Sequence, residues 1–257
     1  MSKTKRKVRK SFFPKKPTAS NMMYYNSLVK VLLVIIIIVV GFVFFHYISF
    51  NHHRVKIKIV TTYKDRYIIP ENIVFLGDSI THRYNLDKYY SDNNVVNSGI
   101  NSDTIDNILS DMYNRVYRYN PSKVVLLIGT NDMLKDDNDK ISLGIESIIN
   151  QIHKKMPFTK IYVESIYPVN NSLDNSMVKN RDNNRILELN GMIMSLCKKF
   201  NFTKYVNIYD SLVKNAKLNE EYTEDGLHLN DKGYDIVTEI IDNEVIEDNK
   251  NMELNNE

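Results

Sequence analysis

Cysteine is almost absent from this chain of 257 residues, which contains only Cys197. No disulfide can therefore form within the chain, although this says little about compartment, because exported domains also fold without disulfides. A zinc-type ligand set is missing as well, since His52 and His53 have no cysteine or carboxylate at a useful spacing. We therefore expect a mechanism that uses no metal and no cofactor.

Acidic residues are absent from the start of the chain, and charge of either sign is absent from the segment that follows. Residues 1–30 contain nine Lys/Arg and no Asp/Glu, and residues 31–50 contain none of these four residue types. Since the whole chain has 34 basic and 31 acidic residues, residues 51–257 hold 25 basic and 31 acidic groups. Membrane orientation explains the basic tail better than nucleic-acid binding does, because of the segment that follows it.

An unbroken apolar segment, VLLVIIIIVVGFVFFHYISF, covers residues 31–50. A helix of about 20 residues extends roughly 30 Å, which matches the hydrocarbon thickness of a bilayer. A buried core helix is the alternative, but such helices seldom have this aliphatic length. The excess of Lys/Arg before the segment predicts a cytoplasmic tail at 1–30 and a single transmembrane helix that anchors an extracellular domain to the cell membrane.

A cleaved signal peptide is the competing interpretation of residues 31–50. It is disfavoured because the apolar core is long and no small-x-small cleavage site follows it. An uncleaved signal-anchor is therefore predicted, followed by a stalk or edge strand at 51–70 that ends at Pro70. A folded domain at 71–246 and a flexible acidic tail at 247–257 complete the predicted organisation.

Short aliphatic runs alternate with longer segments of helical period from residue 71 onward. This alternation predicts an α/β domain, a three-layer α/β/α arrangement in which helices cover both faces of a parallel sheet of flavodoxin-like order 2-1-3-4-5. The five expected strands are 73–77, 95–98, 124–129, 160–165 and 205–208. The expected helices are 104–119, 141–155, 185–200 and 232–246, and the asparagine-rich segment 170–184 is expected to be a mobile loop.

Polar or glycine residues follow three of the expected strands. Ser79 comes after the first strand, Gly99 after the second and Asn131 after the third. The carboxyl ends of parallel strands meet at one edge of the sheet, where open α/β sheets bind ligands. Asp225 and His228 precede the last helix, which the same topology returns to this edge. We therefore expect these five residues to come together.

This set of residues has the composition of a nucleophilic catalytic site. A serine hydroxyl needs a base to react at neutral pH, and His228 is the expected base for Ser79. Asp225, three residues earlier, is expected to accept a hydrogen bond from the other ring nitrogen. The backbone N–H groups of Ser79 and Gly99 and the side-chain amide of Asn131 are the expected oxyanion donors. The pattern predicts a Ser-His-Asp hydrolase.

Four sequence blocks carry a resemblance to a known family. They are Gly77-Asp78-Ser79-Ile80, Asn97-Ser98-Gly99, Gly129-Thr130-Asn131-Asp132 and Asp225-Gly226-Leu227-His228-Leu229-Asn230. The chain resembles the SGNH hydrolases, the GDSL-type esterase/lipase superfamily, with Ile80 in place of the usual leucine. The resemblance implies the same three-layer fold and the same roles for Ser79, Gly99, Asn131, Asp225 and His228. An α/β-hydrolase is disfavoured because residues 77–81 lack the second glycine of the G-x-S-x-G motif.

Simpler roles are open for several of these polar residues. Ser79 could be a helix N-cap and Asn131 a turn residue. Asp78 is expected to hold the turn beside Ser79, and Asp132 to cap a helix or orient a neighbour. His82 has no adjacent carboxylate in sequence and is expected at the surface or at a pocket rim. Three further residues that follow strands are candidates for the border of an acyl pocket: Ser165, Pro168 and Asp210.

The combined expectation is a membrane-anchored serine esterase that releases acyl groups, specifically acetyl, from extracellular carbohydrate. A lysophospholipase or other lipid esterase is an alternative, because the anchor holds the site near the bilayer surface. An O-acyltransferase would use the same three residues to pass the acyl group to a sugar hydroxyl. The third alternative is a binding domain that has lost activity. The expected partners are an acyl-ester substrate and the membrane, with no nucleic acid, and the sequence leaves the oligomeric state open.

Overall fold

The computed structural model describes residues 39–42, 72–91 and 94–247. The predicted basic tail and stalk, nearly all of the predicted span at 31–50, and the tail beyond residue 247 lie outside these ranges. No helix within the described ranges has both the length and the apolar character needed to span a bilayer. The chain divides into two units, Met1–Ile68 and Ile69–Glu257, and the fold described below is that of the second unit.

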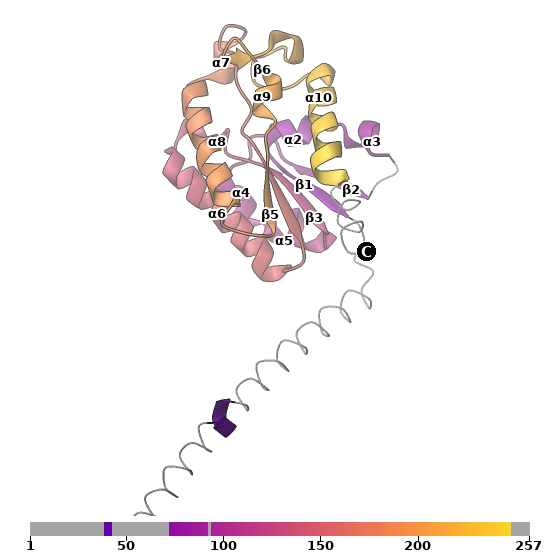
Figure 1. Ribbon diagram of the computed structural model, residues 1–257. Helices are drawn as coiled ribbons and strands as arrows, with labels where there is room; N and C mark the ends of the chain where they lie inside the picture. Colours follow the sequence, from indigo (N-terminus) through magenta and orange to yellow (C-terminus); the bar gives the residue numbers. More distant parts are fainter. Residues whose placement is uncertain (1–38, 43–71, 92–93, 248–257) are drawn as a thin grey trace, which may run out of the picture. The chain divides into compact units, whose positions relative to one another are not determined.

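A five-stranded parallel sheet forms the centre of the second unit (Figure 1). Its strands are β1 Ile73–Gly77, β2 Val95–Gly99, β3 Lys123–Leu127, β4 Lys160–Glu164 and β5 Thr203–Val206. They are ordered β2-β1-β3-β4-β5, and Ile73 of β1 pairs with Val95 on one side and with Lys123 on the other. The predicted parallel sheet and its strand order are confirmed.

Two strands end two residues earlier than predicted. β3 ends at Leu127, because Gly129 has a φ of +128° and has left the extended conformation. β5 ends at Val206, because Ile208 has helical backbone angles and leads into α9 Tyr209–Leu212. Both differences lie at the carboxyl edge of the sheet, where the backbone turns away from the strand direction.

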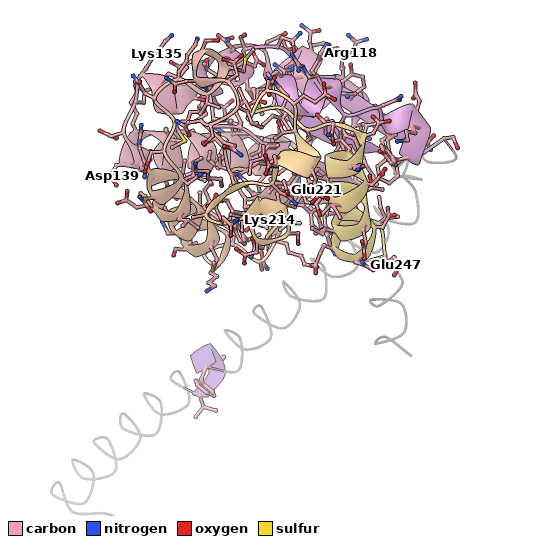
Figure 2. The ribbon with its side chains drawn as sticks, turned by 90° about the horizontal axis from the view of Figure 1, so that it is seen from above. Arg118, Lys135, Asp139, Lys214, Glu221 and Glu247 are labelled. Carbon is pink, nitrogen blue, oxygen red and sulfur yellow. The ribbon has the colours of Figure 1, made fainter. Side chains whose placement is uncertain are left out.

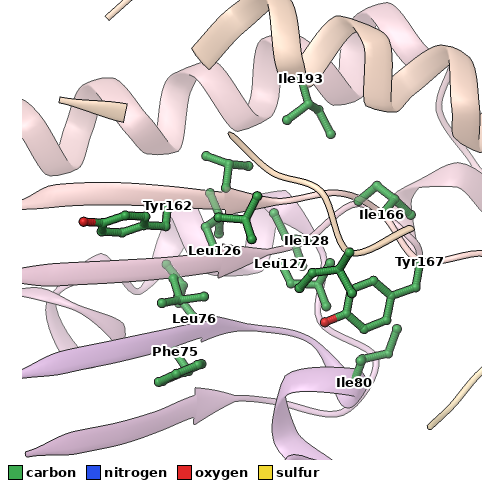
Figure 3. Packing of buried hydrophobic residues seen from close by; sticks show 14 of the residues in the cluster. Phe75, Leu76, Ile80, Leu126, Leu127, Ile128, Tyr162, Ile166, Tyr167 and Ile193 are labelled. Atoms are coloured by element: carbon green, nitrogen blue, oxygen red, sulfur yellow. The ribbon is translucent and has the colours of Figure 1, made fainter. Parts of the chain in front are cut away.

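Apolar side chains of neighbouring strands form the core. β1 and β3 are buried along their whole length, as expected for strands covered on both faces. Leu76 of β1 and Leu126 of β3 are register partners, Phe75 and Tyr162 contribute from β1 and β4, and Ile193 approaches from a helix (Figure 3). Each of these side chains is at most 1% exposed, and burying one stabilises the fold by about 1.5–3 kcal/mol.

Helices cover both faces of the sheet (Figure 1). One face carries α4 Ile105–Ser110, α6 Asn138–Lys155 and α8 Asn183–Cys197, with α6 packed against both of the others. The other face carries α2 Ser79–Arg83, α3 Leu86–Tyr89 and α10 Asp231–Ile241. The ring of Tyr84, just after α2, stacks on that of Tyr234 in α10 with a centroid separation of 4.9 Å. The three-layer α/β/α arrangement is therefore confirmed.

The two long helices begin slightly earlier than their apolar periodicity predicts. Asp137 caps α6 by accepting a hydrogen bond from the backbone N–H of Lys140 at 2.8 Å. Asp182 caps α8 in the same way through the N–H of Asn184 at 3.0 Å. Aspartate is a favoured N-cap because its carboxylate satisfies N–H groups that have no acceptor inside the helix.

The predictions of single helices at 104–119 and 232–246 were wrong. The first is broken into α4, α5 Met112–Arg115 and a short 3₁₀ turn Tyr117–Tyr119. The break turns Arg115 into the protein, where its carbonyl accepts from the Ser98 hydroxyl at 2.8 Å. The second helix, α10, ends at Ile241 and is followed by a π-helical turn whose Val245 carbonyl accepts from the buried ammonium of Lys123.

The segment 170–184 is not the free loop that its composition predicts. It contains the short helix α7 Asn175–Val178, and its first residue is fixed at both backbone and side chain. The N–H of Asn170 donates to the Gly226 carbonyl at 2.8 Å, and its side-chain amide donates to the Leu218 carbonyl at 3.0 Å. The second contact reaches an unpredicted hairpin of β6 Val213–Lys214 and β7 Lys217–Leu218. The segment is therefore tied to the loop that carries His228.

Charged side chains of both signs lie on the surface of the second unit (Figure 2). The labelled examples, all exposed, are Arg118, Lys135, Asp139, Lys214, Glu221 and Glu247. One ion pair among them joins Lys214 to Glu221 at 3.3 Å. Exposed pairs of this kind contribute at most about 1 kcal/mol, so the apolar core carries most of the stability.

Candidate active site

The turn after β1 places Ser79 at the first position of α2. Asp78 caps this helix, because its Oδ1 accepts a hydrogen bond from the N–H of Ile80 at 2.9 Å. Gly77 is needed at the strand end, because a Cβ atom there would lie 2.4 Å from the carbonyl oxygen of Leu127. The result is a sharp turn from strand to helix, with Ser79 held at the carboxyl edge of the sheet.

Ser79 and His228 meet across the fold. The Oγ of Ser79 lies 2.9 Å from the Nε2 of His228, although the two residues are 149 positions apart. The Nδ1 of His228 lies 2.7 Å from Oδ2 of Asp225. Because an ionised carboxylate can only accept, this contact requires the hydrogen on Nδ1 and leaves Nε2 to accept from the serine hydroxyl.

The loop around His228 is fixed by its own hydrogen bonds. Oδ1 of Asp225 accepts from the backbone N–H groups of Leu227 and His228, at 2.9 Å and 2.8 Å. Gly226 between them has a φ of +79°, and a Cβ there would lie 2.2 Å from the Asn170 carbonyl oxygen. Thr223 donates its hydroxyl hydrogen to the His228 carbonyl at 2.6 Å. These contacts hold the imidazole in one orientation toward Ser79.

Asp225 stays ionised because of these same contacts. Partial burial acts to raise its pKa, but the hydrogen bonds from the His228 ring and from the two backbone N–H groups outweigh it and hold the pKa below 3.8. Arg83 lies 3.8 Å from Oδ2 of Asp225, at a half-exposed position. An ionised Asp225 is what the orienting role requires, because it must stabilise a positively charged imidazole.

The three predicted oxyanion donors differ in whether their N–H groups already have a hydrogen-bond acceptor. As the first N–H of α2, the Ser79 N–H has no acceptor inside the helix. The N–H of Gly99 already donates to Oδ1 of Asn97 at 2.9 Å, so it would reach a substrate only by sharing its hydrogen. Gly99 allows close packing instead, because a Cβ there would lie 2.2 Å from the backbone nitrogen of His82. Ser79 therefore offers the better backbone donor.

Asn131 is held on both sides of its side-chain amide. Its Nδ2 donates to the carbonyl of Asp103 at 2.9 Å, and its Oδ1 accepts from Nη2 of Arg181 at 2.9 Å. One N–H of Nδ2 is thereby used, and the other has no acceptor in the part of the chain that the structure describes. That remaining N–H is the one available to a ligand.

A buried ion pair joins α5 to the loop after β2 and to the ends of β1 and β2. Arg115 pairs with Asp103, both at least 94% buried at the side chain, and donates to the Gly77 carbonyl at 3.0 Å. It also donates to the Ser98 carbonyl and to the Ser98 hydroxyl. Both Arg115 and Arg181 were missed in the sequence analysis, because the apolar periodicity of their segments does not predict which distant residues the two side chains contact.

Asp78 and Asp132 have supporting positions. Asp132 accepts from the N–H of Ile105 at 3.1 Å and so positions the start of α4. Burial raises the pKa of Asp78 to about 7, although the hydrogen bond from Ile80 and the charge of Arg181 act in the opposite direction. The predictions that Asp78 holds the turn and that Asp132 caps a helix agree with these contacts.

Within the described ranges, no side-chain hydrogen bond joins the remaining predicted residues to Ser79 or His228. His82 is exposed, and its Nδ1 lies 3.2 Å from the Gly99 carbonyl oxygen. Ser165 was expected to border a pocket but is fully buried, where its hydroxyl accepts from the N–H groups of Ile208 and Tyr209. Asp210 is exposed and binds Asn207, and Pro168 is buried. Within the described ranges no group of His, Cys, Asp or Glu is arranged to hold a metal ion.

Glu164, at the end of β4, predicts a pH-dependent stability. It is buried and accepts from the Tyr167 hydroxyl, and burial raises its pKa from 4.5 to about 7 despite that bond. Between these pH values the folded protein binds more protons than the unfolded chain. The stabilising contribution of the protonated Glu164 side chain is therefore lost as pH rises through this window. Glu164→Gln keeps an oxygen acceptor and cannot ionise. We expect its free energy of unfolding, relative to the parent, to increase from pH 5 to pH 8 in urea titrations.

The exposed Glu239→Gln is the matched control, because it removes the same charge from the protein surface, and the pH dependence found for Glu164→Gln should exceed that of this control. A Glu164→Gln difference that stays constant or shrinks with pH would contradict this account.

The match to a known family and the structural neighbours identify the chain as a carboxylic ester hydrolase. The chain belongs to the GDSL-like lipase/acylhydrolase family, whose family model matches residues 75–236. The resemblance predicted from the four sequence blocks is therefore confirmed, and the match covers nearly the whole sheet and the segments that carry the three residues.

Individual proteins of known sequence or structure support this assignment. A Streptococcus pneumonia structure, described provisionally as a platelet activating factor, is 30% identical over 72% of this chain and 90% of that one, with a TM-score of 0.65. A GDSL-like lipase from Bacteroides thetaiotaomicron is 25% identical over 72% of this chain and 95% of that one, with a TM-score of 0.61.

The N-acylneuraminate cytidylyltransferase of Escherichia coli O18:K1:H7 (strain RS218) is 32% identical over 128 residues, which is 48% of this chain. The match spans only 27% of that relative's length.

Proposed function

We propose that the chain hydrolyses carboxylic esters through an acyl-enzyme formed on Ser79. The observation that carries this proposal is the 2.9 Å contact between the Ser79 hydroxyl and the His228 ring nitrogen. A serine at this distance from a neutral, oriented imidazole can lose its proton as it attacks. The Asp225 carboxylate, 2.7 Å from the other ring nitrogen, stabilises the imidazolium that results.

The reaction follows from these positions. Oγ of Ser79 attacks the ester carbonyl while its proton passes to Nε2 of His228, and the carbonyl oxygen becomes an oxyanion. The Ser79 N–H and the free N–H of Asn131 donate to that oxygen. The imidazolium returns its proton to the departing alcohol, which leaves an acyl-Ser79. A water molecule then repeats the attack with His228 as base, so the acid is released and Ser79 is regenerated.

The substrate that we propose is an acetyl ester of an extracellular carbohydrate. The E. coli relative, of which the chain matches 27%, is named for an N-acylneuraminate, and this name favours a carbohydrate over a lipid. The predicted outward placement of the domain brings secreted or cell-wall polysaccharide within reach. A lipid ester is the competing substrate, because a membrane anchor would keep the site near the bilayer.

Acyl chain length separates these two substrates. With the full chain in detergent, we expect kcat/KM for p-nitrophenyl acetate to exceed that for p-nitrophenyl octanoate by about 10-fold or more. Carbohydrate O-acetyl esters should release free acetate. A preference for the longer chain would support the lipid esterase instead, and transfer of acetyl to an added sugar in place of release would identify an acyltransferase.

We also propose that residues 31–50 anchor the chain in the cell membrane with the amino terminus in the cytoplasm. The uncharged apolar length of this segment and the nine basic residues before it support the proposal. Protease added to intact cells should remove the 71–246 domain, and the chain should stay in the membrane fraction at high salt. Protection of that domain from protease would overturn the orientation.

A further inference from the structure

Arg181 makes the most extensive set of hydrogen bonds near Asn131. It is 3% exposed and lies in the 170–184 segment, between α7 and α8. Its Nε donates to the carbonyl and hydroxyl oxygens of Thr130, at 2.8 Å and 3.1 Å. Its Nη1 donates to the carbonyls of Met177 and Val178, and its Nη2 donates to Oδ1 of Asn131 at 2.9 Å. One guanidinium thus joins α7 to the loop that follows β3.

The chemistry of these partners determines which way the Asn131 amide faces. A guanidinium only donates hydrogen bonds and a backbone carbonyl only accepts them. Oδ1 must therefore face Arg181, and Nδ2 must face the Asp103 carbonyl. If the amide were rotated by 180°, two donors would oppose each other at Arg181 and two acceptors at Asp103.

We propose that Arg181 is a positioning residue that fixes the Asn131 amide with its free N–H directed at the oxyanion. This inference rests on the proposed function, because it assigns Arg181 a role only through an oxyanion donor. Preorganised donors stabilise a transition state strongly because they need no reorientation during the reaction. Lysine cannot replace the arginine, since a single ammonium cannot reach Thr130, the α7 carbonyls and Asn131 at once.

A double-mutant cycle between the two residues tests the proposal. Asn131→Ala should lower kcat for p-nitrophenyl acetate by about 10²–10³-fold with a much smaller change in KM. Arg181→Met should lower kcat by about 10–10²-fold, again with little change in KM. In the Asn131→Ala background, Arg181→Met should cost less than about 3-fold more, because the donor that it positions has already been removed.

Arg185 provides a matched control. It lies one turn further along, is half-buried, and donates to the carbonyls of Met133 and Asp136 and to the side chain of Asn138, but not to Asn131. Arg185→Met therefore removes three hydrogen bonds to neighbouring segments, where Arg181→Met removes five. Any effect that it has on kcat should be the same in the Asn131→Ala background as in the parent.

Folding and function are separated by two further measurements. Thermal unfolding of each variant shows whether a loss of kcat follows a loss of stability. If Arg181→Met fails to fold, Arg181→Lys is the alternative variant, because it keeps the positive charge. We expect Arg181→Lys to lower kcat by about 10-fold, also without additivity to Asn131→Ala. Additive losses for Arg181 and Asn131, as for the Arg185 control, would overturn the positioning role.

The same experiments distinguish a failure of the Arg181 inference from a failure of the proposed function. If Ser79→Ala removes activity while the Arg181 and Asn131 losses add, only the Arg181 inference is wrong. If Ser79→Ala retains full activity, the acyl-enzyme proposal itself is wrong.

Discussion

Replacing Ser79 with alanine should lower kcat for ester hydrolysis by about 10⁴-fold or more, because among the described residues no other hydroxyl bonds to Nε2 of His228. The substitution removes one hydrogen bond of the folded state, which is worth only about 1 kcal/mol. The melting temperature should therefore change by a few degrees at most. Steady-state kinetics with p-nitrophenyl acetate and a thermal melt of the same preparation measure the two effects.

A fluorophosphonate probe locates the nucleophile directly. It should label the parent at Ser79 and leave Ser79→Ala unlabelled. Ser147→Ala is the control, since Ser147 is exposed in α6 and its hydroxyl donates only to the Leu143 carbonyl in the same helix. Undiminished turnover by Ser79→Ala, or labelling at another serine, would exclude Ser79 as the nucleophile.

Replacing His228 with alanine should reduce kcat to a similar extent, because the serine hydroxyl then has no base. The double variant Ser79→Ala/His228→Ala should be hardly slower than either single variant, since the two groups act in one step. Additive losses would mean that the two residues act independently, which contradicts the proposed proton transfer.

His82 is the informative control for this experiment. It is only three residues from Ser79 in sequence, but it is exposed and its Nδ1 lies next to the Gly99 carbonyl oxygen. We expect His82→Ala to change kcat by less than about 10-fold. A loss at His82 comparable to that predicted for His228 would reassign the base.

Two of the predicted contacts at the site follow from local signals in the sequence. Asp225 precedes His228 by three residues, so their contact needs only one turn of backbone, and Asp78 caps the helix that begins at the next residue. The distant contact between Ser79 and His228 was predictable because a parallel sheet collects its strand ends on one edge.

The predictions that were wrong concern residues whose contacts lie far away in the sequence. The helix expected over 104–119 is broken because Arg115 reaches Gly77 and Ser98, which are distant in sequence. Ser165 follows a strand, as Ser79 does, but its neighbour β5 ends beside it and its hydroxyl is used by the backbone of α9. Neither outcome can be read from periodicity, because each depends on which segment lies alongside.

The amino-acid sequence by itself was enough to predict the strand order, the alternation of layers and the three residues of the Ser79–His228–Asp225 triad. These features depend on apolar periodicity, caps and turns, whose energetics are set within a few residues. Tertiary structure alone decided that the 170–184 segment is anchored, that the Gly99 N–H already has an acceptor, and that Arg181 donates a hydrogen bond to Asn131. Those outcomes depend on the pairing of buried polar groups between distant segments, and burial makes such pairing obligatory without specifying the partner in the local sequence.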